Sequence, residues 1–433
     1  MPKIIRILLL LGLLVTASIA IDAQAASSRI DVLHVKGTIN PVLVDYIERG
    51  IKQAEEDNAI ACIIQMDTPG GLDTSTRLII QAMDKAQIPI VVYVPAGARA
   101  ASAGFFITIA ADIAAMAPDT TIGSAHPVAM GAEGEAEMSE AMKAKVTNEA
   151  AAYARGIASA HGRNVEWAEK AVKESANVEA PKALELNVID MVAPNLDALV
   201  SQLDGRQVTL LDGSVVSLHT QGATIEHIKM STIEDFLYTI SDPNIAYILL
   251  SLAMLGIMAE IFNPGLIFPG VVGGICGLLA FYSLGMLPVN YAGVLLIVLA
   301  FGLFIAEVFT TTFGLFTAGG ITSLVIGSLI LFKGGPLFQV SPWLIAIVAI
   351  IVVALFAFVI NRVIRAHRRQ ASTGREELIG KTAVVKVALE PEGTVFFKGE
   401  RWTAISDKGR VEPGEAVIIT KVDGLKLYVT KKE

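Results

Sequence analysis

The segment from Ile245 to Ile364 carries almost no charged side chains. Such a segment fits a membrane better than a water-exposed surface, because about 20 consecutive apolar residues already span the hydrocarbon core of a bilayer. The composition agrees, since 53% of the 433 residues are hydrophobic, only 18% are charged and the mean hydropathy is +0.58. The sequence therefore predicts a membrane domain, placed at residues 243–365, with further domains on either side.

We expect about five membrane spans, several of them short and interrupted by glycine and proline, so that some could be broken or re-entrant helices. Residues 259–274 resemble residues 306–320, and this internal repeat indicates a duplicated two-span unit plus one extra helix. Glu260 and Glu307 stand at matching positions of this repeat. Each is either a functional carboxylate at membrane depth or a residue at the membrane interface that caps the following loop, and we favour capping. The expected spans are 245–262, 270–287, 291–309, 317–332 and 343–364.

The two ends of the chain predict its orientation in the membrane. Residues 1–25 have the pattern of a signal peptide, with Lys3 and Arg6 ahead of an apolar run and a small-x-small site at Ala23–Ala25. An uncleaved anchor is the alternative, and either one exports the segment after residue 26. Basic residues directly after the last span belong in the cytoplasm, which requires an odd number of spans. They are Arg362, Arg365, His367, Arg368 and Arg369.

Residues 28–200 alternate short β-branched runs with amphipathic stretches, which predicts an α/β layer fold with a mainly parallel sheet, in a domain placed at residues 26–230. In such a sheet, sites form where strands end and loops begin. Asp212–Gly213 predicts a later β-hairpin. The expected strands are Ile30–Val35, Ile60–Met66, Ile90–Val94 and Ile113–Ala117, and the expected helices are Pro41–Glu56, Thr74–Ala86, Ala103–Ala111 and Glu137–His161.

Two loops of this domain carry the residue types of acyl-transfer chemistry. Ser102 is flanked by alanine and glycine just before an apolar run, which can open a helix with an exposed hydroxyl. The turn Pro69–Gly71 can bring free backbone N–H groups to the same place. Acyl transfer needs such a nucleophile and such an oxyanion hole. A lone serine here would more simply be a small packing residue, but the combination favours the catalytic interpretation.

A serine nucleophile also needs a base, and three residues are candidates. His126 follows the next strand, but the region around Glu174–Asn177 offers no aspartate to orient its imidazole. Lys145 and Lys143 lie near the start of a long helix. A lysine base must lose its charge, which burial can promote by lowering a pKa of about 10.4. Most helix lysines are solvated, so spacing alone leaves the base undecided.

Residues 375–433 are polar and rich in β-branched residues, and their turns predict a five-stranded barrel of the OB type. Trp402 and Phe397 alternate with polar residues as core positions do, so this domain offers no exposed aromatic surface for nucleic acid. The net charge of −8 gives no reason to propose nucleic-acid binding for the chain as a whole. We expect a protein-docking module.

Cys62 and Cys276 are expected to be free thiols.

Four segments resemble the long-form NfeD family of membrane-bound serine proteases, whose protease domain is related to the Clp peptidase and to the crotonase-like class. They are TPGG at Thr68–Gly71, AASAG at Ala100–Gly104, MAPDTTIGSAHPV at Met116–Val128 and KVTNEAAAY at Lys145–Tyr153. The resemblance covers the whole chain. The segment at Asn177–Ala183 departs from the commoner family pattern, which weakens inference about the substrate more than about catalysis.

The resemblance implies a Ser-Lys dyad formed by Ser102 and Lys145. It implies oxyanion donors at the backbone N–H groups of Gly70 or Gly71 and of Ala103. His126 lies near the histidine of relatives that use a Ser-His-Asp triad, but Ser175 stands at the acid position, so His126 is the alternative base. The family also implies apolar peptide substrates, a stomatin-like membrane protein as partner, a homo-oligomer, and the bacterial plasma membrane as location.

The sequence thus predicts an ATP-independent serine endopeptidase with its protease domain outside the cytoplasm and its OB domain inside. No Walker sequence, HExxH motif or Cys/His ligand cluster is present, so we expect no cofactor and no metal. A catalytically inactive membrane scaffold that organises partner proteins is the alternative. A transporter that uses Glu260 and Glu307 is a weaker third hypothesis.

Overall fold

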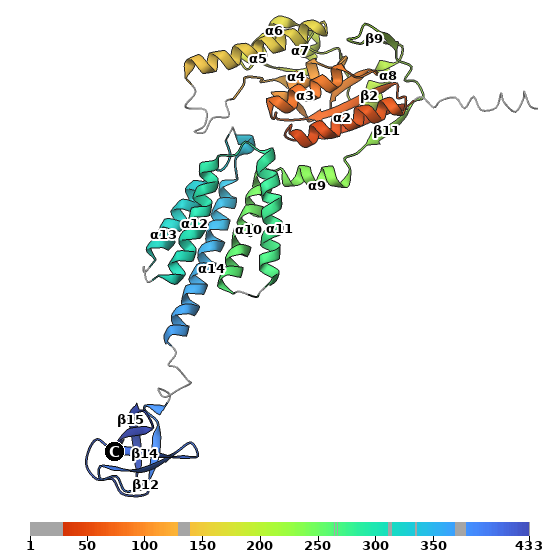
Figure 1. The fold of residues 1–433 in the computed structure, drawn as a ribbon. Helices are drawn as coiled ribbons and strands as arrows, with labels where there is room; N and C mark the ends of the chain where they lie inside the picture. Colours follow the sequence, from red (N-terminus) through yellow and green to blue (C-terminus); the bar gives the residue numbers. More distant parts are fainter. Residues whose placement is uncertain are drawn as a thin grey trace, which may run out of the picture. The chain divides into compact units, whose positions relative to one another are not determined.

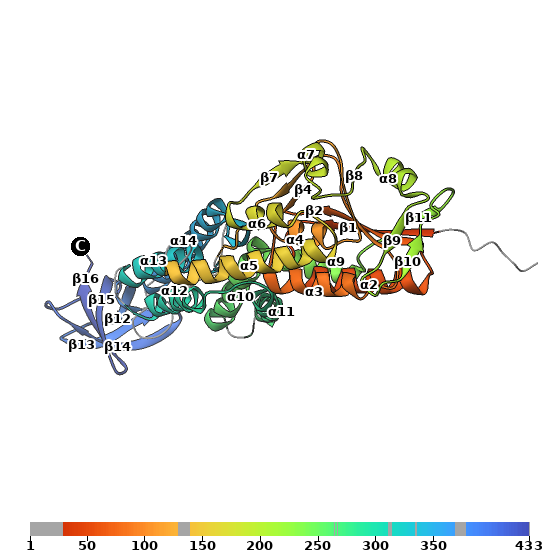
Figure 2. The same ribbon diagram turned by 90° about the horizontal axis from the view of Figure 1, so that it is seen from above.

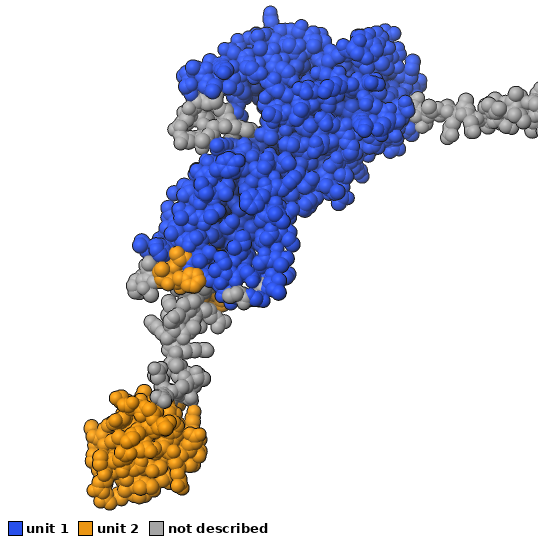
Figure 3. Space-filling model, in the orientation of Figure 1, with its two compact units in different colours: residues 1–305, 312–349 blue, residues 306–311, 350–433 orange. Residues whose placement is uncertain are grey.

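The computed structural model describes residues 29–128, 139–263, 265, 267–310, 314–333, 336–368 and 378–432. The expected signal peptide and the side chains of the basic cluster at residues 362–369 lie outside the described part. Two compact units are distinguished (Figure 3), one of Met1–Ile305 with Thr312–Ala349 and the other of Ala306–Thr311 with Ile350–Glu433.

A six-stranded parallel sheet forms the centre of the N-terminal domain, in the order β11-β1-β2-β3-β5-β8. Three central strands, β2, β3 and β5, consist almost wholly of buried apolar residues, as strands covered on both faces do. The strand bounds are β1 Arg29–Lys36, β2 Ala61–Asp67, β3 Ile90–Val94, β5 Ile113–Met116, β8 Met191–Val192 and β11 Thr224–Ile228.

Helices cover both faces of this sheet. Strand alternation sends Leu33 and Val35 to the core beneath α2 to α6, and Ile30 and Val32 to the core beneath α8. Figure 2 shows α2 and α3 on one side of the strands and α8 on the other. The helices are α2 Pro41–Glu56, α3 Asp73–Asp84, α4 Ala103–Ile109, α5 Glu140–Ala160, α6 Val165–Lys173, α7 Ala180–Glu185 and α8 Leu196–Leu203.

Two smaller sheets complete the domain. The expected hairpin forms from β9 (Gln207–Thr209) and β10 (Val215–Ser217), which pair antiparallel. A second sheet has the order β4-β6-β7 and consists of three-residue strands. Its strands are β4 Arg99–Ala101, β6 Thr121–Gly123 and β7 Asn177–Glu179. Strand β4 of this small sheet leads directly into Ser102, the nucleophile expected from the sequence.

Helix α9 (Thr232–Ile240) connects the α/β domain to the membrane domain. It begins with a capping box in which Ser231 and Glu234 each bond the other's backbone N–H. Two residues after its last one, Asp242 caps the next helix, and Pro243 stands at the first helical position. The chain therefore passes from α9 into the membrane domain through a very short turn.

Five helices come next, at the places where five spans are predicted (Figure 1). Within the described residues, α10, α11 and α12 are long and apolar enough to cross a membrane, whereas α13 and the described apolar part of α14 are shorter. Glycines allow close packing, since a Cβ on Gly256 of α10 would lie 2.6 Å from Gly273 Cα of α11. The bounds are α10 Pro243–Phe262, α11 Ile267–Met286, α12 Tyr291–Phe309, α13 Leu315–Leu329 and α14 Pro342–Arg368.

The C-terminal strands close a barrel in the order β12-β13-β14-β16-β15. Its core is apolar and includes Phe397, with Trp402 packed against it, as their alternation predicts. The fold class predicted from the sequence is thus confirmed in all three parts. The strands are β12 Thr382–Val387, β13 Glu392–Phe397, β14 Glu400–Ser406, β15 Ala416–Asp423 and β16 Lys426–Lys431.

A charged pair ties α9 to α2, and its strength should depend on pH. Arg49 Nε and Nη2 donate to the two carboxylate oxygens of Glu234 at 2.8 and 2.7 Å, which lowers the pKa of Glu234 from 4.5 to about 2. A carboxyl whose pKa falls on folding stabilises the fold fully above pH 4.5, and this contribution is lost as the pH falls toward 2.

We expect Arg49→Met to lower the thermal unfolding midpoint of the full chain by a few degrees at neutral pH and by less at about pH 3, where the pair contributes less. Lys52→Met is the matched control, because Lys52 lies on the same helix and is exposed. A deficit of Arg49→Met that stayed constant between the two pH values would contradict this account.

Candidate active site

Ser102 lies at a sharp turn between β4 and α4. Its backbone has φ 49° and ψ −110°, a conformation that L-residues rarely adopt and that costs of the order of 1–3 kcal/mol. The turn is held by a hydrogen bond of 3.0 Å from the Ser102 N–H to the Gly123 carbonyl. The side chain is half-buried and caps no helix, and the hydroxyl has no hydrogen-bond partner among the described residues. The hydroxyl is therefore free to react or to bind.

The glycine turn lies directly against this serine. Thr68 bridges Ala100 in parallel, and the Ala101 N–H donates to the Thr68 carbonyl at 3.2 Å. Gly70 has φ +132°, and a Cβ there would lie 2.9 Å from Ser102 Cβ and 3.3 Å from Ser102 Oγ. Only glycine fits at this position, for both reasons. The structure thus brings together the two loops that the sequence singles out.

The amides of the two loops differ in availability. The Gly70 N–H donates to Thr68 Oγ1 at 3.0 Å and is already satisfied. In the described part of the chain, the N–H groups of Gly71 and Ala103 have no acceptor. Ala103 is the first residue of α4, where N–H groups have no partner inside the helix. Of the three expected oxyanion donors, Gly71 and Ala103 are the ones with a free hydrogen.

His126 lies on the loop after β6 and is exposed. Its Nδ1 lies 2.9 Å from the Val172 carbonyl, and because a carbonyl only accepts, this nitrogen carries the proton and Nε2 is left unprotonated in the neutral ring. Ser175, at the acid position, has φ 54° and forms no described bond with His126. Asn177 Nδ2 donates to Ser124 Oγ at 2.9 Å instead. No acid orients the imidazole among the described residues.

Lys145 lies near the beginning of α5, and its side chain is exposed. No contact among the described residues joins it to Ser102. Lys143 is exposed as well and lies 3.7 Å from a carboxylate oxygen of Glu140. Successive helix residues are about 100° apart, so Lys143 and Lys145 point to nearly opposite sides of α5.

The helix that carries Lys145 is bound to α3 and α4, the two helices that follow the loops of the site. Arg77 on α3 bonds Asp73 at 2.8 Å and Glu149 at 2.7 Å, and its guanidinium lies 4.1 Å from the Tyr153 ring centroid. Tyr153 also stacks on Phe106 of α4, with ring centroids 5.9 Å apart. Burial raises the pKa of Tyr153, which keeps the phenol neutral. Lys145 lies one turn before Glu149, about 6 Å along the axis, on the side that faces Arg77.

Sequence reasoning missed the residues that support this geometry. Thr68 is fully buried, and its hydroxyl contacts both the N–H and the carbonyl of Gly70. A Cβ on Gly104 would overlap the Thr68 methyl group, so that glycine permits the close approach of the two loops. Arg77 gave no signal beyond an i,i+4 pair with Asp73. The TPGG motif alone could have directed attention to Thr68.

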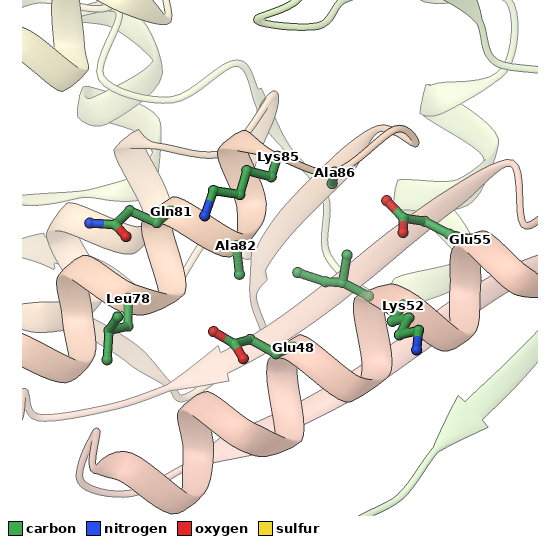
Figure 4. Close-up of a pocket in the computed structure, with 9 residues that line it drawn as sticks. Glu48, Lys52, Glu55, Leu78, Gln81, Ala82, Lys85 and Ala86 are labelled. Atoms are coloured by element: carbon green, nitrogen blue, oxygen red, sulfur yellow. The ribbon is translucent and has the colours of Figure 1, made fainter.

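Other features of the domain do not extend the site. A cavity of about 330 Å³ lies between α2 and α3 (Figure 4) and is lined by charged side chains and Gln81 together with apolar ones such as Ile51 and Leu78. None of the residues around Ser102 lines this cavity, so it is not part of the candidate site. Within the described residues, no group of three or more His, Cys, Asp or Glu side chains could hold a metal ion.

Comparisons with known proteins assign the chain to a family. The model of the NfeD1b N-terminal domain matches residues 29–211, that of the NfeD integral membrane domain matches residues 244–362, and that of the NfeD-like C-terminal, partner-binding domain matches residues 375–431. The chain belongs to the NfeD family. The resemblance noted in the sequence is thereby confirmed. The match to the NfeD integral membrane domain shows that the chain is a membrane protein.

Two curated relatives match nearly the whole NfeD chain. It is 37% identical over 417 residues to the membrane-bound protease PH1510 of Pyrococcus horikoshii, covering 94% of each chain. It is 28% identical over 447 residues to the membrane protein NfeD1b of Bacillus subtilis, covering 96% of each chain. A solved structure of the 1510-N membrane-bound stomatin-specific protease, a lysine-to-alanine mutant in complex with a substrate peptide, is 32% identical and covers 50% of this chain and 98% of its own, with a TM-score of 0.46.

We expect Gly70→Ala to destabilise the full chain more than Gly97→Ala. Both residues have positive φ, +132° and +74°, but a Cβ on Gly97 meets nothing within 4 Å, whereas one on Gly70 meets Ser102. A φ of +132° lies further outside the range open to L-residues than +74° does, so the difference between the variants combines added backbone strain with the clash, about 1–3 kcal/mol. Thermal unfolding in detergent tests this, and equal midpoints for the two variants would show that the loops are further apart than described.

Proposed function

We propose that this chain is a membrane-bound serine endopeptidase that works without ATP and uses Ser102 as its nucleophile. The backbone of Ser102 carries the proposal, because a strained turn from strand to helix is the arrangement in which other serine hydrolases present a nucleophile. The match to the membrane-bound protease PH1510 supports it along almost the full length of the chain.

The proposed oxyanion hole consists of the backbone N–H groups of Gly71 and Ala103. Both amides lack an acceptor in the described chain, and they flank Ser102 from the two loops. The Gly70 amide is bound to Thr68, so we assign Gly70 the role of allowing the close approach of the loops instead of donating to the oxyanion. Fixed donors of this kind stabilise the charge that develops in the transition state.

The proposed base is Lys145. Its neutral amine takes the proton from Ser102 Oγ as this oxygen bonds to the peptide carbonyl carbon, and later gives the proton to the leaving amine. Water then attacks the acyl carbon while Lys145 accepts a proton from it; the bond from this carbon to Ser102 Oγ breaks, and Lys145 returns the proton to that oxygen as the carboxyl product leaves. An exposed ammonium keeps its proton at neutral pH. The proposal therefore requires that the bound peptide cover Lys145 and remove water from it.

The proposed substrates are apolar peptide segments of membrane-associated proteins. Two exposed apolar side chains, Val128 and Met142, stand on the segments next to His126 and Lys145, with exposed fractions of 51% and 48%. They would contact apolar residues of a bound peptide. Because the related 1510-N is named a stomatin-specific protease, we propose a stomatin-like protein as substrate or partner, with the C-terminal barrel as a docking module.

We further propose the arrangement inferred from the sequence: a signal peptide at residues 1–25, a protease domain at 26–230 outside the cytoplasm, a membrane domain at 243–365 with about five spans, and a cytoplasmic barrel domain at 375–433. A homo-oligomer is also proposed. These statements rest on the sequence patterns and on the family.

An inactive membrane scaffold is the second candidate function. The exposure of Lys145 and the lack of a described contact with Ser102 favour it, as does the name of the relative NfeD1b, which mentions no activity. A scaffold would keep the folded loops of the site as packing elements. The two candidates differ in one measurable property, which is peptide cleavage that depends on Ser102.

We expect the full chain in nanodiscs to cleave a peptide with an apolar centre, and Ser102→Ala to abolish cleavage. Lys145→Ala and Lys145→Arg should each lower the rate by about 10²–10⁴-fold, since neither side chain can act as a base. Lys143→Ala is the matched control, because Lys143 points to the other side of the same helix and should be dispensable. Thermal unfolding of each variant checks that it is folded.

Three results would redirect the assignment. Loss of cleavage in His126→Ala with normal cleavage in Lys145→Ala would make His126 the base. Cleavage that survives Ser102→Ala would remove the serine mechanism. A folded wild-type chain that cleaves neither the peptide nor a stomatin homologue, and that does not react with a fluorophosphonate probe, would support the scaffold.

We expect Arg77→Met to lower kcat by up to about 10²-fold while KM changes little, because the beginning of α5 would lose its anchor and Lys145 its position. Arg155→Met is the control, because Arg155 lies on the same helix, ten residues after Lys145, and pairs with Glu169 at 3.0 Å. Loss of folded protein would lower the apparent kcat in the same way, so the rate is expressed per active site, counted by reaction with a fluorophosphonate probe, and a normal kcat per active site would contradict this role.

A further inference from the structure

Helix α9 lies between the ranges that the family models match, which end at residue 211 and resume at residue 244. After its first residue, Thr232, the other eight of its nine residues divide into three strips along its length, since successive residues are about 100° apart. One strip is Glu234 and Tyr238, the second is Asp235 and Thr239, and the third is Ile233, Phe236, Leu237 and Ile240. Each strip has different surroundings.

The first strip is bound to the α/β domain. Glu234 accepts two hydrogen bonds from Arg49 of α2, and the Tyr238 hydroxyl donates to the Lys36 carbonyl at the end of β1, at 2.8 Å. Tyr238 packs so closely on Gly37 that a Cβ there would overlap its hydroxyl. Burial raises the pKa of Tyr238 to about 12, so it stays neutral and keeps this bond. The second strip, Asp235 and Thr239, is exposed.

The third strip is apolar and only partly covered. Its last member, Ile240, is buried, and the Ile240 carbonyl accepts a hydrogen bond from Ser283 Oγ of α11. Toward the start of the helix the same strip opens to solvent, since Ile233 is 71% and Phe236 48% exposed. The strip is therefore continuous with the membrane helices at one end and unpartnered at the other.

We propose that α9 is an interfacial helix, whose apolar strip inserts Ile233 and Phe236 between lipid headgroups at the surface of the bilayer. Lipid is the proposed partner because the apolar strip is continuous with the membrane helices. Its covered end, at Ile240, lies against α11, one of the helices long and apolar enough to span a membrane, and only two residues separate α9 from α10. A helix with an apolar strip opposite charged residues binds in this way at the boundary of headgroups and acyl chains. Lipid then covers the part of the strip that the protein leaves open.

This location has a mechanical consequence. The strip bound to the α/β domain and the strip facing lipid belong to one rigid helix, so the Arg49–Glu234 and Tyr238–Lys36 bonds would hold that domain next to the lipid surface. If the chain is the protease proposed above, its substrates would then be segments that emerge close to the membrane. The lipid contact itself does not depend on that activity.

Collision accessibility of a nitroxide label tests the proposal. The full chain carries Cys276→Ser, while Cys62 is fully buried and remains unlabelled. Ile233→Cys or Phe236→Cys places the label on the apolar strip, and Asp235→Cys or Thr239→Cys places it on the exposed polar strip of the same helix. The labelled chains are reconstituted in vesicles of phosphatidylcholine and phosphatidylglycerol, and collisions with oxygen and with a water-soluble nickel chelate are compared.

At positions 233 and 236 we expect collisions with oxygen to exceed those with the nickel chelate several-fold, and at positions 235 and 239 the reverse. Nickel accessibility at 233 and 236 equal to that at 235 and 239 would place the strip in water and overturn the proposal. Low accessibility to both reagents at 233 and 236 would also overturn it, because a second copy of the chain or another protein would then cover the strip. Peptide cleavage is not needed for either result.

Discussion

The close approach of the segments Thr68–Gly71 and Arg99–Ser102 is the constraint on which the proposed chemistry depends. Backbone hydrogen bonds between Thr68 and both Arg99 and Ala101 hold the two segments side by side. Between these segments and α4, the chain turns through a positive φ at Ser102, at a cost of about 1–3 kcal/mol. The surrounding bonds offset that strain and hold Ser102 against Gly70, and the amides without described acceptors belong to the neighbouring residues Gly71 and Ala103.

The same constraint extends to the helix that carries Lys145. Gly71 is separated from α3 by a single residue, so the position of the glycine turn also fixes the first turn of α3 and with it Arg77. Arg77 contacts Glu149 and Tyr153 from there, and Tyr153 stacks on the helix that begins after Ser102. The proposed nucleophile, the proposed oxyanion amides and the helix of the proposed base thus belong to one connected set of contacts. A displacement of α3 would move all three together.

The sequence predicts those parts of the fold that a local pattern determines. Buried strands such as Ile90–Val94 and the helix Pro41–Glu56 are found with the predicted bounds, because β-branched runs and helical periodicity are local signals. The three-residue strands β4, β6 and β7 were not predicted, since pairing with distant segments defines them. The same holds for Thr224–Ile228, which adds to β1 as a parallel edge strand although it comes after a hairpin in sequence. Likewise, the motifs give Ser102 and its glycines, but neither the occupied Gly70 amide nor the exposure of Lys145.

That exposure has a physical consequence for how such an enzyme would be controlled. A lysine in water is protonated at neutral pH and cannot accept a proton, whereas a lysine covered by apolar groups loses its charge more easily. Val128 and Met142 are exposed apolar side chains near His126 and Lys145 in sequence, and in the proposed mechanism an apolar peptide would remove water from Lys145 whereas a charged one would not. The base would thus become active only when a suitable substrate lies on it. Selectivity for apolar segments would then arise from the proton-transfer step as well as from binding, which suits a protease fastened next to a membrane and surrounded by other proteins.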